Sequence, residues 1–218
     1  MARKRCTSRW RWITQNAPLP YGTHSEIIGI SPPIVESDAP YRRPPMLDTF
    51  KELIANQFDG AFSMLNACID KCPETVWNSR VANYLFCQVA FHVLFWTDFY
   101  LGRNEESFRH QPFHRAHEHF FGDYEEFEDR APVSRHDKMS ISAYLEHCRH
   151  KMSEAIAAET ADTLSARSGF LRRAFSRAEL HIYNIRHIQH HTAMLSLRLR
   201  LDANQGIPWI GSGWRRQV

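Results

Sequence analysis

Two histidines four residues apart, His187 and His191, have the spacing in this sequence that best suits metal binding. On a helix they would lie about 40° apart around the axis and about 6 Å apart along it. Two imidazoles placed in this way can bind one metal ion, as the paired histidines of HExxH helices do. Such pairs also arise by chance, with the imidazoles exposed or hydrogen-bonded to protein groups. The pair alone leaves both interpretations open.

His92 strengthens the metal interpretation because it stands in the most apolar segment of the chain, between Phe91 and Val93. A buried imidazole needs a polar partner, since leaving a polar group unpaired in apolar surroundings costs a few kcal/mol. Three inward-facing neutral imidazoles are best satisfied by sharing a cation. Three protein ligands with an open position are typical of catalytic metal sites, whereas closed structural zinc sites have four. We therefore predict one divalent ion bound by His92, His187 and His191.

Three further residues are candidates for the surroundings of this ion. Gln88 and Asn184 each lie one helical turn before a predicted ligand. Their side chains could hydrogen-bond an imidazole N–H, which is the common role, or orient a bound water or substrate. His190 lies at the edge of the same helix face. Imidazole suits zinc, nickel, iron and copper alike, so the sequence predicts a divalent ion such as zinc, nickel or iron without choosing among them.

A second group of histidines is a weaker candidate. His110, His114, His117 and His119 stand in the polar segment 103–135 beside several acidic residues. Such a segment can bind metals weakly, but nothing in the sequence buries or orients the ligands. We interpret it as a solvent-exposed loop. The chain has no recognisable Ser/His/Asp or Cys/His nucleophile pattern and no glycine-rich phosphate-binding motif, so no catalytic residue beyond a metal site is identified.

Four segments with helical periodicity must position these side chains. They run from Met46 to about Pro73, from about Ser79 to Leu101, over about 140–158, and from Ser176 to about Leu201. Ser176 and Glu179 form a capping box at the start of the fourth. Strand alternation and internal repeats are missing, so the predicted class is all-α, a four-helix bundle. The 33-residue connection after the second helix is too long for a hairpin and predicts a crossover.

The remaining residues flank this bundle, which we place at 46–209. Residues 1–45 hold seven of the eleven prolines and a net charge of +4, and they predict a flexible tail. A start site placed too early is an alternative, and the prolines argue against a targeting peptide. Residues 210–218 are predicted to be a short tail. Since residues 46–218 carry a net charge of −1, we expect no nucleic-acid partner. No apolar run suggests a membrane span.

The five cysteines indicate a reducing compartment. Their number is odd, they form no CxxC pair, and no secretory signal peptide precedes them. We therefore expect free thiols and a cytoplasmic protein.

The two histidine segments resemble those of the DinB/YfiT-like superfamily of metal-binding four-helix bundles. The segments extend over residues 91–101 and 184–191, and the resemblance covers roughly Met46 to Trp209. It implies that the ligands are one histidine of the second helix and an HxxxH pair of the fourth, which again gives His92, His187 and His191. Relatives include S-transferases and isomerases that use low-molecular-weight thiols, and many proteins without a known activity.

The expected function is therefore a metal-dependent enzyme with thiol S-transferase or hydrolase chemistry. Three neutral ligands leave the ion its full positive charge, which acidifies a bound water or thiol. The expected substrates are a low-molecular-weight thiol and a small apolar electrophile, in a cavity walled by Val89, Phe95, Met194 and Leu195. The alternative is a non-catalytic metal-binding bundle whose ion is structural, acting as a stress-associated binding protein or as a homodimer.

Overall fold

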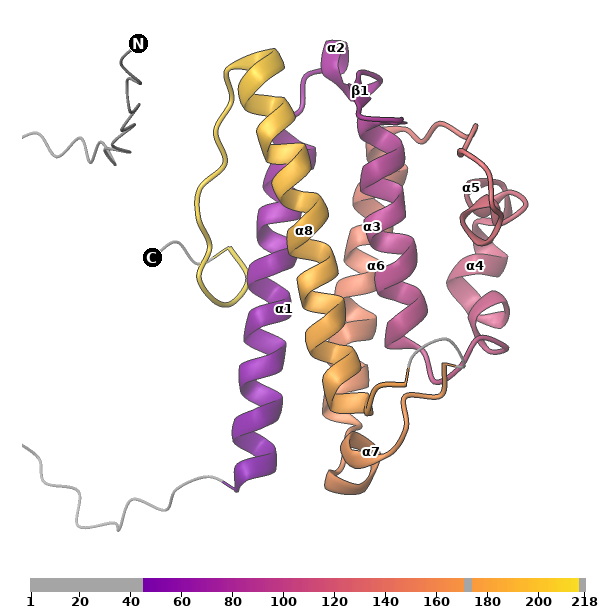
Figure 1. Cartoon of the computed structure of the whole chain (residues 1–218), viewed down its shortest axis with the longest axis vertical. Coiled ribbons are helices and arrows are strands. Elements are labelled where there is room, and N and C mark those ends of the chain that lie inside the picture. Colours follow the sequence, from indigo (N-terminus) through magenta and orange to yellow (C-terminus); the bar gives the residue numbers. More distant parts are fainter. Residues whose placement is uncertain (1–44, 171–173, 216–218) are drawn as a thin grey trace, which may run out of the picture. The chain divides into compact units, whose positions relative to one another are not determined.

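Four long helices dominate the computed structural model, which describes residues 45–170 and 174–215 (Figure 1). They are α1 (Met46–Lys71), α3 (Phe86–Leu101), α6 (Lys138–Ala157) and α8 (Arg177–Ala203). The predicted all-α class is confirmed, and Ser176 Oγ caps α8 by accepting a hydrogen bond from the Glu179 backbone at 3.2 Å. The tail predicted over 1–45 lies outside the described residues, apart from its last residue.

The four long helices pack so that consecutive ones are not always neighbours. Both α1 and α3 pack against α6 and α8, which places α1 diagonally across from α3. Lys51, near the start of α1, donates to the Ala157 carbonyl at the end of α6 (2.8 Å), so these two helices are antiparallel. Arg177, at the start of α8, donates to the Gly102 carbonyl just after α3 (2.7 Å), so α3 and α8 are antiparallel too. Helices α3 and α6 run in the same direction, so the connection between them must run back along the length of α3 before α6 begins (Figure 1).

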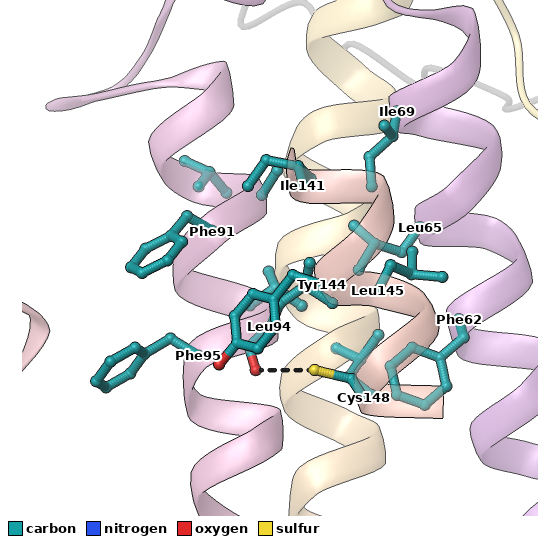
Figure 2. Close-up of a cluster of buried hydrophobic side chains, with 14 of the residues drawn as sticks. Phe62, Leu65, Ile69, Phe91, Leu94, Phe95, Ile141, Tyr144, Leu145 and Cys148 are labelled. Carbon is teal, nitrogen blue, oxygen red and sulfur yellow. Dashed lines mark hydrogen bonds between the residues drawn. The ribbon is translucent and has the colours of Figure 1, made fainter. Parts of the chain in front are cut away.

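The core lies between the four long helices, and Figure 2 shows the part of it formed by α1, α3 and α6. It contains Phe62, Leu65 and Ile69 of α1, Phe91, Leu94 and Phe95 of α3, and Ile141, Tyr144, Leu145 and Cys148 of α6. Fully burying one such large apolar side chain stabilises the fold by about 1.5–3 kcal/mol. Helix α3 is buried almost all round, and His92 and Trp96, one turn apart, are its only residues that are not buried. The two residues lie on the same face of α3.

The second long helix starts later than the sequence predicts. Residues 74–85 form a short helix α2 (Glu74–Trp77) and a two-stranded antiparallel hairpin, β1 (Arg80–Val81) and β2 (Tyr84–Leu85). The hairpin turns at Ala82, whose φ is +56°. The helix begins at Phe86 because the Gln88 side chain accepts a hydrogen bond from the Leu85 backbone N–H at 2.8 Å.

The connection between α3 and α6, residues 102–137, is not the exposed loop that its polarity predicts. It contains four short helices, η1 (Phe108–His110), α4 (Pro112–Ala116), α5 (Glu118–Phe121) and η2 (Glu125–Phe127). Phe108, His114 and Phe121 are buried, so the connection packs onto the outer face of α3. The prediction of a solvent-exposed loop is therefore wrong for these three residues, which are buried.

His114 is buried because it belongs to a charged cluster around Asp98 of α3. Its Nε2 lies 2.7 Å from Asp98 Oδ2, and the Tyr144 hydroxyl donates to the same oxygen at 2.9 Å. The Lys151 ammonium forms an ion pair with Asp98 Oδ1. Burial alone would raise the pKa of Asp98, but the hydrogen bond with His114, the neighbouring His147 at 3.7 Å and the charge of Lys151 hold that pKa well below its usual range. Burial lowers the pKa of His114.

A second buried cluster joins the end of α3 to the start of α8. The Arg177 guanidinium donates to the carbonyls of Tyr100 (2.9 Å), Leu101 (3.0 Å) and Gly102 (2.7 Å), which are orphan acceptors at a helix end. Glu159 pairs with this guanidinium at 2.9 Å. A short helix, α7 (Ala161–Ser165), follows Glu159 and leads toward α8.

The described part of the C-terminal segment packs on α1, whereas the sequence places the bundle's end at Trp209. Residues 204–215 run back beside α1 (Figure 1). Ile210 is 5% exposed, and the Gly213 N–H donates to the Asn56 carbonyl at 2.9 Å. Within the described residues, no helix combines the length and apolarity that crossing a bilayer requires.

Candidate metal centre

The three predicted ligands converge between the neighbouring helices α3 and α8. His92 lies on α3, and His187 and His191 lie one turn apart on α8. The Nε2 atoms of His92 and His187 are 3.4 Å apart. One nitrogen from each of the three rings lies within 4.8 Å of the other two, so the group could hold a metal ion.

These separations fit a tetrahedral metal site. Two nitrogens, each about 2.1 Å from one zinc ion at a tetrahedral angle, are about 3.4 Å apart. The His92–His187 pair already has this spacing, and the widest separation in the group, which is at most 4.8 Å, would have to close by up to about 1.4 Å. All three imidazoles are half-buried, so an ion and a small molecule can reach them from solvent.

Glu126, in the connection, orients the His92 ring. Its Oε2 lies 2.7 Å from His92 Nδ1 and accepts a second hydrogen bond from Trp96 Nε1 at 3.1 Å. The carboxylate side chain is only 7% exposed. A proton on Nδ1 satisfies the carboxylate and leaves the lone pair of Nε2 directed at His187. A carboxylate behind a ligating histidine is a regular feature of metal sites.

His191 is suited to a ligand role by its surroundings. Burial, with smaller contributions from His92 and His190, lowers the pKa of His191 to about 4, so its imidazole is neutral at neutral pH. Its Nδ1 is buried and has no hydrogen-bond partner among the described residues. A neutral imidazole has one N–H and one lone pair, and a bound cation would satisfy the lone pair of this ring.

The residues predicted to surround the ion make other contacts in the structure. Gln88 donates to the carbonyls of Pro132 (2.9 Å) and Ser134 (3.0 Å) and so anchors the end of the connection. Asn184 donates to the Thr97 carbonyl at 3.1 Å, and its Oδ1 is buried without a hydrogen-bond partner in the part of the chain that is described. His190 is exposed, and its ring packs edge-on against His191 with centroids 4.9 Å apart.

Glu126, rather than these residues, is the partner of a candidate ligand, His92, and sequence reasoning missed it. It lies 34 residues beyond His92 in a segment of many carboxylates, and no helical spacing relates the two. The available signal was only compositional: an acidic segment follows the helix that carries a buried histidine.

The cavity beside the imidazoles, here called the histidine cavity, has a volume of about 310 Å³. Its lining residues are His92, Trp96, Tyr100, Tyr183, His187 and His191. The predicted walls are therefore wrong. Val89, Phe95 and Leu195 are buried in the core, and Met194 is half-buried without lining the cavity. Residues four apart on α3, Trp96 and Tyr100, form the wall instead.

The second histidine group does not converge. His114 is bound to Asp98, while His110, His117 and His119 are exposed, and among the described residues these four are not part of a metal-binding group. The structure thus brings His92, His187 and His191 together and adds Glu126 to them. Compared with known proteins, the chain matches no family model, no curated protein and no solved structure.

Proposed function

We propose that this chain is a metal-dependent enzyme of the DinB/YfiT-like four-helix-bundle kind, with one divalent ion bound by His92, His187 and His191. The observation that carries the proposal is the convergence of three imidazole nitrogens, one of them on a ring oriented by the buried carboxylate of Glu126. Zinc, nickel and iron all suit this donor set. When bound, such an ion supplies a Lewis acid that lowers the pKa of a coordinated water or thiol.

The protein's own groups favour a nucleophile supplied from solution. Burial raises the pKa of Cys68 and, with smaller contributions from neighbouring charges, that of Cys72, each to about 12. The described cysteines, Cys68, Cys72, Cys87 and Cys148, are free and buried. Since a thiol must ionise to attack, none of these thiols is suited to nucleophilic catalysis at neutral pH. This supports a low-molecular-weight thiol or water as the attacking group.

The histidine cavity suits a small second substrate. Its volume of about 310 Å³ is at the lower end of the range for small-molecule sites. Trp96, Tyr100 and Tyr183 supply aromatic walls that exclude water from one side of the imidazoles. Closed structural zinc sites use four protein ligands, whereas the described residues offer three here, which favours catalysis over a structural ion. Absence of nucleic-acid and membrane partners and a cytoplasmic location remain predictions from composition.

Metal content is the first test. Elemental analysis of the protein, purified without an affinity tag, should give about one equivalent of a divalent metal per chain. His92→Ala and His191→Ala should each abolish it, because two imidazoles bind far more weakly than three. His190→Ala and His117→Ala are the matched controls and should retain the metal. Stoichiometric metal in both His92→Ala and His191→Ala would refute the site.

Activity is the second test. The metal-loaded protein is screened with thiol cosubstrates and a chromogenic electrophile, and separately with simple esters and amides. Thiol-dependent turnover that disappears in His187→Ala supports the transferase, and hydrolysis without thiol supports the hydrolase. If the protein binds one metal and catalyses neither reaction, the alternative holds, a non-catalytic metal-binding bundle.

A further inference from the structure

A second cavity, here called the aromatic cavity, lies on the other side of the wall formed by Trp96 and Tyr100. Its volume is about 850 Å³. Its lining residues are Trp96, Phe99, Tyr100, Glu105, Arg109, Glu126, Phe127, Glu128, Asp129 and Phe170. The histidine cavity shares Trp96 and Tyr100 with it, and Glu126 contacts His92 from its side. A molecule bound here therefore lies next to the metal centre.

The lining combines aromatic faces with carboxylates. Trp96, Phe99 and Phe127 pack edge to face, with ring centroids 5.3–5.7 Å apart. Aromatic faces attract cations through the negative charge of their π-systems, and Trp is the strongest of the three side chains that do so. Clusters of such rings are the usual site for alkylated ammonium groups.

The carboxylates outnumber the cations around this cavity. Four carboxylates and one guanidinium line it among the described residues. Glu128 is paired with Arg130, which leaves Glu105, Glu126 and Asp129 facing Arg109. The Arg109 guanidinium is stacked on the Tyr124 ring, 4.3 Å from its centroid, and lies 5.4 Å from the centroid of Phe127, so this edge of the cavity already holds a cation on aromatic rings. Arg109 makes no ion pair with these carboxylates in the described structure. The described lining is thus net negative.

Glu126 supports a bound cation for a reason other than the number of charges in the lining. Its side chain is 7% exposed, and its one ion-pair partner within the described chain is His92. Its Oε2 is used by His92 and Trp96, while Oε1 makes no hydrogen bond to a described residue. Oε1 is not among the buried atoms that lack a partner, so this oxygen is open to solvent and can face a bound cation. Glu126 is itself one of the residues that line the aromatic cavity.

We propose that the aromatic cavity binds an organic cation, namely an alkylated ammonium group held against Trp96 and Phe127 and attracted by Glu105, Glu126 and Asp129. Its role as the substrate subsite of the metal centre rests on the proposed function. The binding itself does not, because the cavity's rings and carboxylates need no metal. This changes the expected electrophile from a purely apolar molecule to one that carries a positive charge.

The test is titration calorimetry of the full chain with benzyltrimethylammonium, and with benzenesulfonate as an anion of similar size. The cation should bind and the anion should not. Phe127→Leu should weaken binding about fivefold through the lost cation–π contact. Glu105→Gln should weaken it about two- to threefold, whereas Glu106→Gln should not, because Glu106 is adjacent and also exposed but does not line the cavity.

Equal binding of the anion, no binding of the cation, or equal effects of Glu105→Gln and Glu106→Gln would overturn the proposal. The same titration of His187→Ala separates the two hypotheses. A cation that binds both to the wild-type chain and to this variant supports the cavity even where metal analysis has refuted the centre.

Discussion

Glu126 is the single residue that most directly tests how the centre is built. Its carboxylate holds the His92 ring at 2.7 Å with Nε2 directed at His187. We predict that Glu126→Gln weakens metal affinity about 10- to 100-fold, since an amide orients the ring less firmly and does not raise its basicity. Competition with a chelator measures the affinity. Glu128→Gln is the matched control, because Glu128 pairs with Arg130, and an unchanged affinity in Glu126→Gln would contradict this role.

Asp98 is the residue that we expect to matter most for stability. Its side chain is fully buried and pairs with Lys151 and His114. Asp98→Ala should lower the free energy of unfolding by about 3–5 kcal/mol, because it leaves a partly buried cation without its partner. Urea denaturation measures the change. Asp202→Ala, which breaks the exposed pair with Arg198, should cost about 1 kcal/mol or less, and similar losses in both variants would refute the prediction.

The three histidines were predictable at this scale, whereas their partners were not. His187 and His191 share a face through the helical period, and the apolar neighbours of His92 indicate that it is turned inward. Glu126 and the pairing of His114 with Asp98 depend on how the connection folds back over α3. That path is set by tertiary packing of side chains such as Phe108 and Phe121, which leave no periodic signal in a polar segment.

At the scale of elements, the junction of α3 and α8 should make stability depend on pH. Burial would raise the pKa of Glu159, but hydrogen bonds from Thr163, Arg177 and His181 outweigh it and lower the pKa from 4.5 to about 2. Because the folded pKa is the lower one, the stabilisation is present above about pH 4.5 and is lost as the pH falls toward 2.

We therefore predict that Glu159→Gln flattens this part of the stability profile. Denaturant unfolding at a series of pH values between 6 and 2 measures the slope for the wild type and the variant. The exposed Glu154 provides the comparison, since Glu154→Gln should leave the slope unchanged. A Glu159→Gln variant with the wild-type slope would show that the junction does not titrate as described.

The long helices were predictable because α1, α6 and α8 each carry an apolar face with helical period and α3 is a continuous apolar segment. Three of the four begin within two residues of the predicted position. The hairpin before α3 was not, because its strands are two residues long and its turn places Ala82 at a φ of +56°, which its side chain does not favour. Contacts with the helix ends stabilise that turn, so local sequence preference is a poor guide to it.

At the scale of the whole molecule, the C-terminal segment should contribute to stability. Ile210 is 5% exposed against α1, whereas the preceding Trp209 is 68% exposed. We predict that Ile210→Ala lowers the free energy of unfolding by about 2–5 kcal/mol, and that Trp209→Ala changes it by about 0.5 kcal/mol or less. Thermal and urea unfolding measure both. A larger effect of Trp209→Ala would mean that the segment packs in another way.

The connection leaves α3 and returns to place Glu126 behind His92, so binding of the proposed ion would be coupled to local opening of the chain. Coupling between two equilibria is reciprocal. If the docked η2, through Glu126, raises the metal affinity by a given factor, bound metal must raise the equilibrium constant for docking of η2 onto α3 by the same factor. Amide hydrogen exchange of Phe127 and Glu128, whose N–H groups bond within η2, should slow by up to that factor when metal is added. In Glu126→Gln the slowing should disappear.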